Sequence, residues 1–274
     1  METVKKTKKF RLPETFNPCF FAFIVPVIIL TVIFMGRNVY PFGDSIYLRS
    51  DAYHQYAPFY KELYRKLTEG GSLFYSWNIG MGVNFTALYA YYLASPINLL
   101  LGFFAIDGNI LITMDVLIIL KTGLAGCTFA YYLAKRFNTT SYSISAVAIF
   151  YALSSYMAAF SWNIMWVDCI VLLPIIALGI ENIVNKKKWL MYTLSLGFAI
   201  FSNYYIAIML CMFSVIYFAI TLFSMNKFNI HSACVRALYF IKGSLLAGGL
   251  GAVMFLPALY ALSYTASANS EFPT

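Results

Sequence analysis

The sequence predicts an all-α polytopic membrane protein with about seven transmembrane helices and a long first extracytoplasmic loop that contains an interfacial helix. Hydrophobic residues make up 61% of the 274 residues and charged residues only 11%, whereas a soluble domain carries about 25% charged residues. The mean hydropathy is +0.73. The apolar residues also form separate runs of about 20, the length of a helix that crosses the hydrocarbon core. Together these observations indicate that lipid surrounds most of the chain.

The apolar runs place the expected spans at 18–36, 109–133, 142–160, 169–185, 189–203, 204–225 and 237–262. The stretch 189–225 is too long for one helix, so we expect a hairpin that turns at Ser202, Asn203 and Tyr204. A basic leader precedes the first span, but no small-residue cleavage site follows Gly36, which favours a retained helix over a cleaved signal peptide. We therefore treat 1–274 as one transmembrane domain, with 37–108 as its extracytoplasmic loop.

The basic residues indicate a membrane orientation. The net charge of +8 would suggest a nucleic-acid partner if it formed one face, but the basic residues instead gather where apolar runs end. Because cytoplasmic loops carry an excess of lysine and arginine, we expect a multi-pass protein of the cell membrane with a cytoplasmic amino terminus and no nucleic-acid partner. This orientation puts inside the basic groups Lys5–Arg11, Lys135-Arg136, Lys186–Lys188 and Lys227–Arg236.

The five cysteines are scattered, mostly inside apolar runs, and no Cys-x-x-Cys pair is present. This pattern is typical of small buried side chains and does not predict a zinc site or a disulfide framework.

The loop 37–108 is too aromatic and apolar to be disordered, and loops of this length are usually functional. From Asp51 to Leu67 the pattern predicts a helix along the membrane surface, capped by Ser50 or Asp51. Pro58 disfavours helix at Ala57, so the alternative is a regular helix from Ala57 after a shaped loop at 51–56. The expected apolar stripe is Tyr56, Phe59 or Tyr60, Leu63 and Leu67, and the polar residues are Lys61, Glu62, Arg65 and Lys66.

A second apolar stretch of the loop, 83–106, is long enough for an eighth span. Counting it as a span would move Lys135-Arg136 to the outside, and Ser95-Pro96 interrupts it. We therefore expect an interfacial or re-entrant segment here.

Ionisable residues within the spans are costly and indicate function by default. Lys121 lies in the middle of the second span, where its ammonium needs an anion. Asp115 is a poor intrahelical partner because six residues is not a helical pair spacing, so an internal ion pair and contact with a ligand phosphate both stay open. Asp168 opens the fourth span, either as a helix-start cap or as part of a site shared with Asp51.

The predicted topology gathers acids, amides and tyrosines at the outer boundary above a cation at membrane depth. A carboxylate there can take a proton from an acceptor hydroxyl, and a lysine can balance a phosphate leaving group. The same residues would also suit a permeation route, so both chemistries stay open at this point.

A succession of short motifs resembles the YfhO family of bacterial membrane proteins, and it extends over nearly the whole chain in order. The motifs are Tyr40-Pro-Phe-Gly-Asp44, Asp51-x-x-x-Gln55-Tyr56-x-Pro58-Phe59, Gly80-x-Gly82, Tyr91-Tyr92-Leu-x-Ser95-Pro96, Asn163-x-x-Trp166-x-Asp168, Leu173-Pro174 and Asn203-Tyr204-Tyr205. Members of that family are usually longer, so the resemblance implies that this chain is an amino-terminal portion.

The YfhO family is similar to glycosyltransferases of the GT-C type, which use polyprenyl-phosphate-linked sugars and place a catalytic acid in the first outside loop. The resemblance implies a GT-C-like enzyme that glycosylates lipoteichoic acid or another cell-wall polymer. Asp51 would be its catalytic base, with Asp44 and Asp168 as auxiliary acids and Lys121 at the lipid phosphate. Further substrate-binding candidates are His54, Gln55, Tyr56, Asn163, Asn203 and Tyr204.

The resemblance leaves the cofactor open. The acidic pair common in other GT-C enzymes is absent at Asp51, and Asp44 or Asp168 would have to supply a second carboxylate for a divalent metal. No metal-binding motif is present in the sequence. Two other functions stay open: a transporter or flippase for a lipid-linked precursor, and a non-catalytic membrane scaffold.

Overall fold

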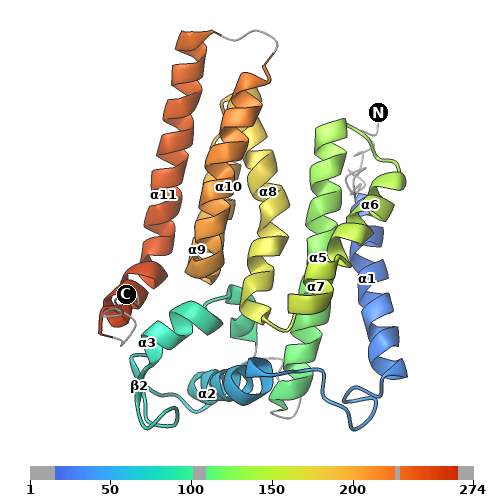
Figure 1. Ribbon diagram of the computed structural model, residues 1–274, viewed down its shortest axis with the longest axis vertical. Coiled ribbons are helices and arrows are strands. Elements are labelled where there is room, and N and C mark those ends of the chain that lie inside the picture. Colours follow the sequence, from blue (N-terminus) through green and yellow to red (C-terminus); the bar gives the residue numbers. More distant parts are fainter. Residues whose placement is uncertain (1–15, 101–108, 226–228, 265–274) are drawn as a thin grey trace, which may run out of the picture.

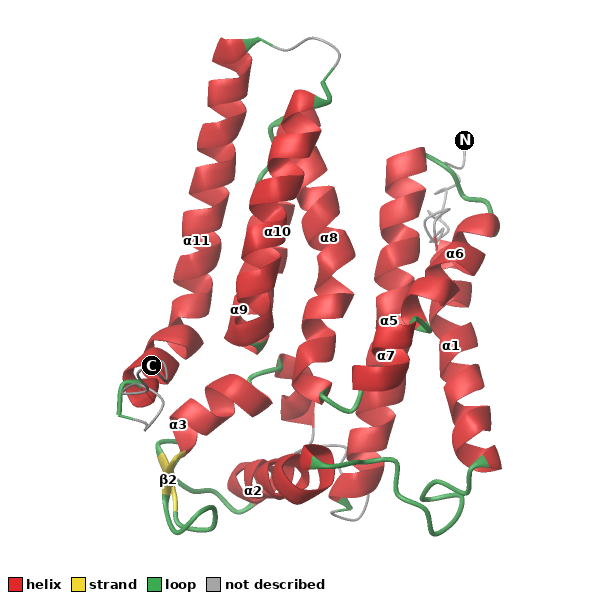
Figure 2. Cartoon of the chain, in the orientation of Figure 1, coloured by secondary structure: helices red, strands yellow, loops and turns green. Residues whose placement is uncertain are grey.

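The computed structural model describes residues 16–100, 109–225 and 229–264, and helices dominate them (Figures 1 and 2). The long helices are α1 (Phe16–Gly36), α5 (Ile110–Phe137), α8 (Ile164–Lys186), α10 (Tyr204–Phe223) and α11 (Ile230–Leu262). Shorter helices are α2 (Ala57–Thr68), α3 (Phe85–Leu88), α6 (Ser143–Ala152), α7 (Ser155–Phe160) and α9 (Leu190–Ser202). The all-α polytopic fold is therefore confirmed.

The long helices run roughly side by side and form two groups (Figure 1). In one group α1 and α6 pack on α5; in the other α9, α10 and α11 pack together, and α8 joins the groups by contacting α5, α9 and α10. Small residues allow close approach, as is common where helices associate in lipid. A Cβ on Gly126 would lie 2.2 Å from the Ala22 carbonyl oxygen, and one on Gly179 would lie 2.6 Å from the Tyr192 Cα.

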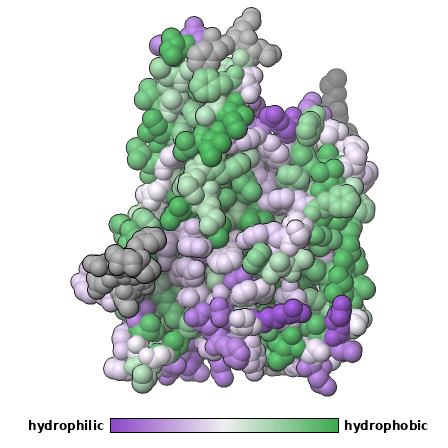
Figure 3. Space-filling view, in the orientation of Figure 1, coloured by the Kyte–Doolittle hydropathy of each residue, from purple (hydrophilic) through white to green (hydrophobic). Residues whose placement is uncertain are grey.

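On the face shown in Figure 3, hydrophobic residues (green) gather along the two outer edges of the bundle, as a lipid solvent requires. Among the described residues, six helices are long and apolar enough to cross a membrane, and α6 with α7 counts as one of them, Ser143–Phe160. The protein is therefore a multi-pass membrane protein.

The expected fifth span is realised as a shorter helix. α9 has 13 residues, about 20 Å at the helical rise of 1.5 Å per residue, whereas the hydrocarbon core is about 30 Å thick. The expected hairpin is confirmed: α9 ends at Ser202, Asn203 is extended, and α10 begins at Tyr204. The third span also differs from the prediction, because an extended Ser154 separates α6 from α7.

The loop after α1 crosses the end of the bundle, and α2 lies transverse to the spans there (Figure 1). A π-helical turn, η1 (Ala52–Tyr56), leads directly into α2, and the Ala57 N–H donates to the Ala52 carbonyl. Pro58 occupies the first turn of α2, where its missing N–H costs nothing. The regular α-helix therefore begins at Ala57, but the segment before it is helical and not a loop.

The expected side-chain pattern of α2 is partly wrong. Tyr56, Phe59, Tyr60 and Leu63 are buried, as predicted. Leu67 is 38% exposed, whereas Glu62 and Lys66 are only 5% and 6% exposed. The reason is the hairpin of β1 (Tyr75–Ser76) and β2 (Val83–Asn84), which supplies polar partners to that side of α2.

The described part of the expected interfacial or re-entrant segment consists of short helical pieces. After β2 the chain forms α3, a π-helical turn η2 (Tyr89–Leu93) and a 3-10 turn η3 (Pro96–Leu100). The break at Ala94-Ser95 keeps these pieces short. Residues 101–106 of the expected segment lie outside the described residues.

Candidate functional site

Asp51 lies at the start of the η1–α2 segment with an exposed side chain. It makes no side-chain capping hydrogen bond, so the predicted capping role is wrong: the helix begins with a π-helical turn instead of the α-turn that a cap serves. The carboxylate is therefore open to water.

The Asp51 charge influences two tyrosines of the loop. The pKa of the Tyr56 hydroxyl is raised by burial first, then by Tyr92 and by the Asp51 carboxylate. The pKa of Tyr92 is raised by burial first, then by Tyr91 and again by Asp51. The Asp51 carboxylate therefore contributes to the raised pKa of both hydroxyls.

The loop is joined to the bundle through Tyr56. Its buried hydroxyl donates to the Asn163 Oδ1 at 2.9 Å, and its ring stacks on Trp162 with centroids 6.1 Å apart. Tyr92 donates to the Gln55 Oε1 at 3.4 Å. The structure thus brings together four residues that the sequence predicted for one site, namely Asp51, Gln55, Tyr56 and Asn163.

A mostly apolar pocket of about 560 Å³ lies next to this group. It is bounded by α3, by η2, by the start of α10 and by the end of α11. Four tyrosines, Tyr91, Tyr92, Tyr204 and Tyr205, line it together with Val83, Asn84, Ala87, Leu88, Ala258, Ala261 and Leu262. Tyr92 thus lines the pocket and also donates to Gln55, which follows Asp51 by four residues in the same helical segment.

Asn203 fixes one wall of this pocket. Its Oδ1 accepts from the Ile206 N–H at 2.9 Å and so caps α10, and its Nδ2 donates to the Tyr91 carbonyl at 2.9 Å. The side chain is fully buried. Of the two candidates in the 202–204 turn, Tyr204 therefore lines the cavity and Asn203 holds η2 against the helices.

Lys121 and Asp168 form an ion pair inside the bundle. The Nζ–Oδ2 distance is 2.7 Å, and the two side chains are 0% and 3% exposed. Lys121 also donates to the Ile164 carbonyl at 3.1 Å. Of the two readings of Lys121, the structure has the internal ion pair, with Asp168 in place of Asp115 as the partner.

Two expectations about the acids need correction. Asp168 does not cap the fourth span, because α8 begins at Ile164 and Asp168 lies in its second turn. Asp168 is buried whereas Asp51 and Asp44 are exposed, so the structure does not bring the three carboxylates to one open surface. Asp44 lies in the turn after α1, and His54 is exposed with its ring edge-on to Tyr53 at 5.3 Å.

A family model described as Bacterial membrane protein YfhO matches residues 22–274. The chain belongs to this family. No curated protein and no solved structure matches it. The match extends from α1 to the end of this YfhO chain and includes the Asp51 loop, the tyrosines of the pocket and the buried ion pair.

The described residues of the YfhO chain were compared with the side-chain groupings that hold metal ions. Within 16–100, 109–225 and 229–264, no group of three or more histidine, cysteine or acidic side chains is arranged to hold a metal ion.

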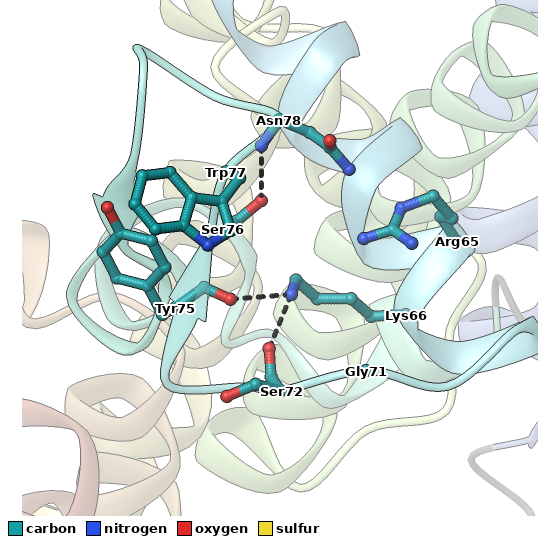
Figure 4. A pocket seen from close by; sticks show the side chains of 8 residues that line it. All are labelled: Arg65, Lys66, Gly71, Ser72, Tyr75, Ser76, Trp77 and Asn78. Atoms are coloured by element: carbon teal, nitrogen blue, oxygen red, sulfur yellow. Dashed lines mark hydrogen bonds between the residues drawn. The ribbon is translucent and has the colours of Figure 1, made fainter.

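A polar cluster under the hairpin of the YfhO chain was not predicted from the sequence. The Glu62 carboxylate accepts from the Arg65 guanidinium at 2.9 and 3.0 Å, from Ser76 at 2.7 Å and from Asn78 at 3.0 Å. Lys66 reaches the carbonyls of Ser72 and Tyr75 (Figure 4). These contacts anchor the hairpin on α2 beside a pocket of about 390 Å³ whose rim carries the exposed Trp77 ring.

We expect Glu62→Gln to destabilise this part of the YfhO chain in a pH-dependent way. The hydrogen bonds from Arg65, opposed by burial and helped by Asn78 and Ser76, lower the pKa of Glu62 from 4.5 to about 2. A lowered folded pKa contributes stability that is present above pH 4.5 and lost as the pH falls through about 2. The variant should therefore lose about 1–3 kcal/mol of unfolding free energy at pH 7.

The measurement is thermal unfolding of the detergent-solubilised protein from pH 7 down to pH 2. The gap between wild type and Glu62→Gln should close below pH 4.5. The matched control Glu69→Gln replaces an exposed acid at the C-terminal end of the same helix and should behave as wild type. An equal gap at all pH values would refute the role of the Glu62 charge.

Proposed function

We propose that this YfhO-family protein is a membrane glycosyltransferase that moves a sugar from a polyprenyl phosphate to an extracytoplasmic acceptor. Lipoteichoic acid or another cell-wall polymer is the proposed acceptor. The observation that carries the proposal is an exposed carboxylate, Asp51, in the segment that Gln55 joins to Tyr92 of the tyrosine-lined pocket. An amphipathic donor needs both environments, an apolar cavity for its chain and a polar edge for its reacting end.

In the proposed step, Asp51 takes the proton of an acceptor hydroxyl as that oxygen attacks the anomeric carbon of the sugar. The bond from the anomeric carbon to the phosphate oxygen breaks, and the polyprenyl phosphate leaves with the electron pair. The pocket binds part of the isoprenoid chain against its tyrosine rings and its alanine and leucine side chains. Gln55 and Tyr56 position the loop through Tyr92 and Asn163.

The ion pair with Asp168 changes the role that we propose for Lys121. Asp168 already neutralises its ammonium inside the bundle. We therefore propose that the two residues position α5 against α8. Lys121 would contact the phosphate directly only in a conformation in which the ion pair is broken. Asp44 and His54, both exposed in the same loop, are proposed contacts of the acceptor.

The proposed orientation puts the amino terminus in the cytoplasm. The helices bring Lys135, Arg136 and Lys186–Lys188 to one end of the bundle, and the Asp51 loop crosses the other end (Figure 1). Lysine-rich ends facing the cytoplasm are the common arrangement, and they leave the Asp51 loop outside with the acceptor.

The test is sugar transfer in membranes that contain the protein, with a polyprenyl-phosphate donor that carries a radiolabelled sugar and with wall polymer as acceptor. The expected result is label bound covalently to the polymer. If the label stays on the lipid and crosses to the other leaflet, the protein is a transporter and not a transferase. Label that neither moves nor reacts, with a range of donors, would favour a scaffold.

A further inference from the structure

A second, strongly basic pocket lies at the end of the bundle opposite the Asp51 loop. α5 and α8 both end there, and the pocket between their last turns has a volume of about 550 Å³. Four cations line it: Lys135 and Arg136 from α5, and Lys186 and Lys188 from the end of α8. In Figure 3 a hydrophilic patch lies at this end of the molecule, between the two helix groups.

The positive charge of this pocket is in excess. Glu181 is the one acidic residue among those that line it, and it is 5% exposed. Its carboxylate is already bound by Arg136 at 3.0 Å and by the hydroxyls of Tyr132 and Tyr217 at 3.0 and 2.6 Å. Within the described residues, no carboxylate forms an ion pair with the three lysines, so their charges remain available to a ligand.

The favourable interaction of these cations with the helix ends does not explain the whole pocket. Cations near the last turn of a helix interact favourably with its dipole, but that role does not require a hollow between the helices. The hollow also combines three kinds of wall: the cations, the side-chain amides of Asn138, Asn182 and Asn185, and apolar side chains such as Leu178 and Met191. A phosphodiester headgroup joined to a glycerol backbone offers charged, polar and apolar groups that match these three kinds of wall.

We propose that this pocket binds the phosphate headgroup of an anionic phospholipid of the surrounding bilayer. Basic pockets between transmembrane helices recognise anionic lipid headgroups in this way. The phosphate oxygens accept charge-assisted hydrogen bonds from Lys135, Lys186 and Lys188, and the amides bind the polar part of the headgroup. The acyl chains lie along the apolar outer faces of the helices. The site is independent of the proposed transferase reaction.

The experiment uses the whole protein in nanodiscs of phosphatidylcholine with or without phosphatidylglycerol. Thermal unfolding reports stabilisation, and native mass spectrometry after detergent extraction counts bound lipids. The variant Lys186→Gln/Lys188→Gln removes two exposed cations of the pocket, and circular dichroism checks that it folds. Lys61→Gln removes one exposed cation at the opposite end of the bundle and is the matched control.

Phosphatidylglycerol should raise the unfolding temperature of the wild type and of Lys61→Gln, and one lipid should remain bound. The double variant should bind this lipid at least about tenfold more weakly, because each charge-assisted hydrogen bond contributes on the order of a tenfold factor. Equal stabilisation of all three proteins would overturn the site, as would stabilisation by phosphatidylcholine alone. Stabilisation by inorganic phosphate without any effect of phosphatidylglycerol would assign the pocket to a soluble anion and overturn the lipid.

Discussion

Replacing Asp51 by asparagine should abolish most of the sugar transfer. General-base catalysis by a positioned side chain contributes about 10²- to 10⁴-fold to a rate, so we expect a loss of that size in kcat with little change in the KM for the donor. The amide keeps the size of the side chain but cannot take the acceptor proton. Because Asp51 is exposed and caps no helix, its substitution should leave the protein stable, within about 0.5 kcal/mol.

The measurement compares initial rates of transfer in membranes with equal amounts of protein. Glu69→Gln is the matched control, since Glu69 is an exposed acid in the same surface segment, with a side chain that is 67% exposed, and the proposed reaction does not use it. Equal rates for Asp51→Asn and wild type would show that Asp51 is not the base. The transferase proposal would then require another acid of the loop as the base, with Asp44 the first candidate.

Replacing Lys121 by methionine should cause the largest loss of stability, about 3–5 kcal/mol. Removing one partner of a buried ion pair leaves an uncompensated charge, and Asp168 is 3% exposed. The change also removes the donor to the Ile164 carbonyl at the first turn of α8. We expect reduced accumulation of the protein in membranes and a strongly lowered unfolding temperature in detergent.

The double variant Lys121→Met/Asp168→Leu separates charge from packing. Well-packed apolar replacements of a buried pair are often neutral or stabilising, so the second change should restore most of the stability. If the double variant is as unstable as the single one, the ion pair is not the reason for the loss. If Lys121→Met alone is as stable as wild type, the assignment of the pair as a structural element between α5 and α8 fails.

The fold could be predicted largely from the sequence because the bilayer constrains it so strongly. Each apolar run has to form a helix that satisfies its own backbone, and the 189–225 run divides at Asn203 because its side chain caps the following helix. The length of α9 and the break at Ser154 could not be predicted in the same way. Both features lie inside apolar sequence, where hydropathy does not indicate how far a helix extends.

The candidate site was predictable where its residues are close in sequence. Asp51, Gln55 and Tyr56 share one short motif and one surface segment. The partner of Lys121 was not predictable from spacing along α5, since Asp168 lies 47 residues away on α8. The spacing rule correctly excluded Asp115, which is buried with an Oδ1 that has no hydrogen-bond partner among the described residues.

The Glu62 cluster was missed for a related reason. Arg65 and Lys66 follow Glu62 by three and four residues, a spacing that predicts ion pairs on a helix surface. The burial of Glu62 and Lys66 depends on a hairpin that brings Ser76 and Asn78 to the carboxylate from 14 and 16 residues away. Trp77-Asn78 in the sequence carries no signal of that packing.

In the proposed transferase, the short α9 would give a lipid donor a lateral path from the bilayer to the pocket. If α9 begins at the membrane surface beside Lys186–Lys188, it ends about 10 Å before the opposite surface. Past that point the bilayer meets the start of α10 and the η2 turn, which Asn203 ties to the bundle, and the tyrosine-lined pocket lies between them and the end of α11. The proposed polyprenyl-phosphate donor would then enter from the side, with its tail in the hydrocarbon core and its head near Asp51 in water.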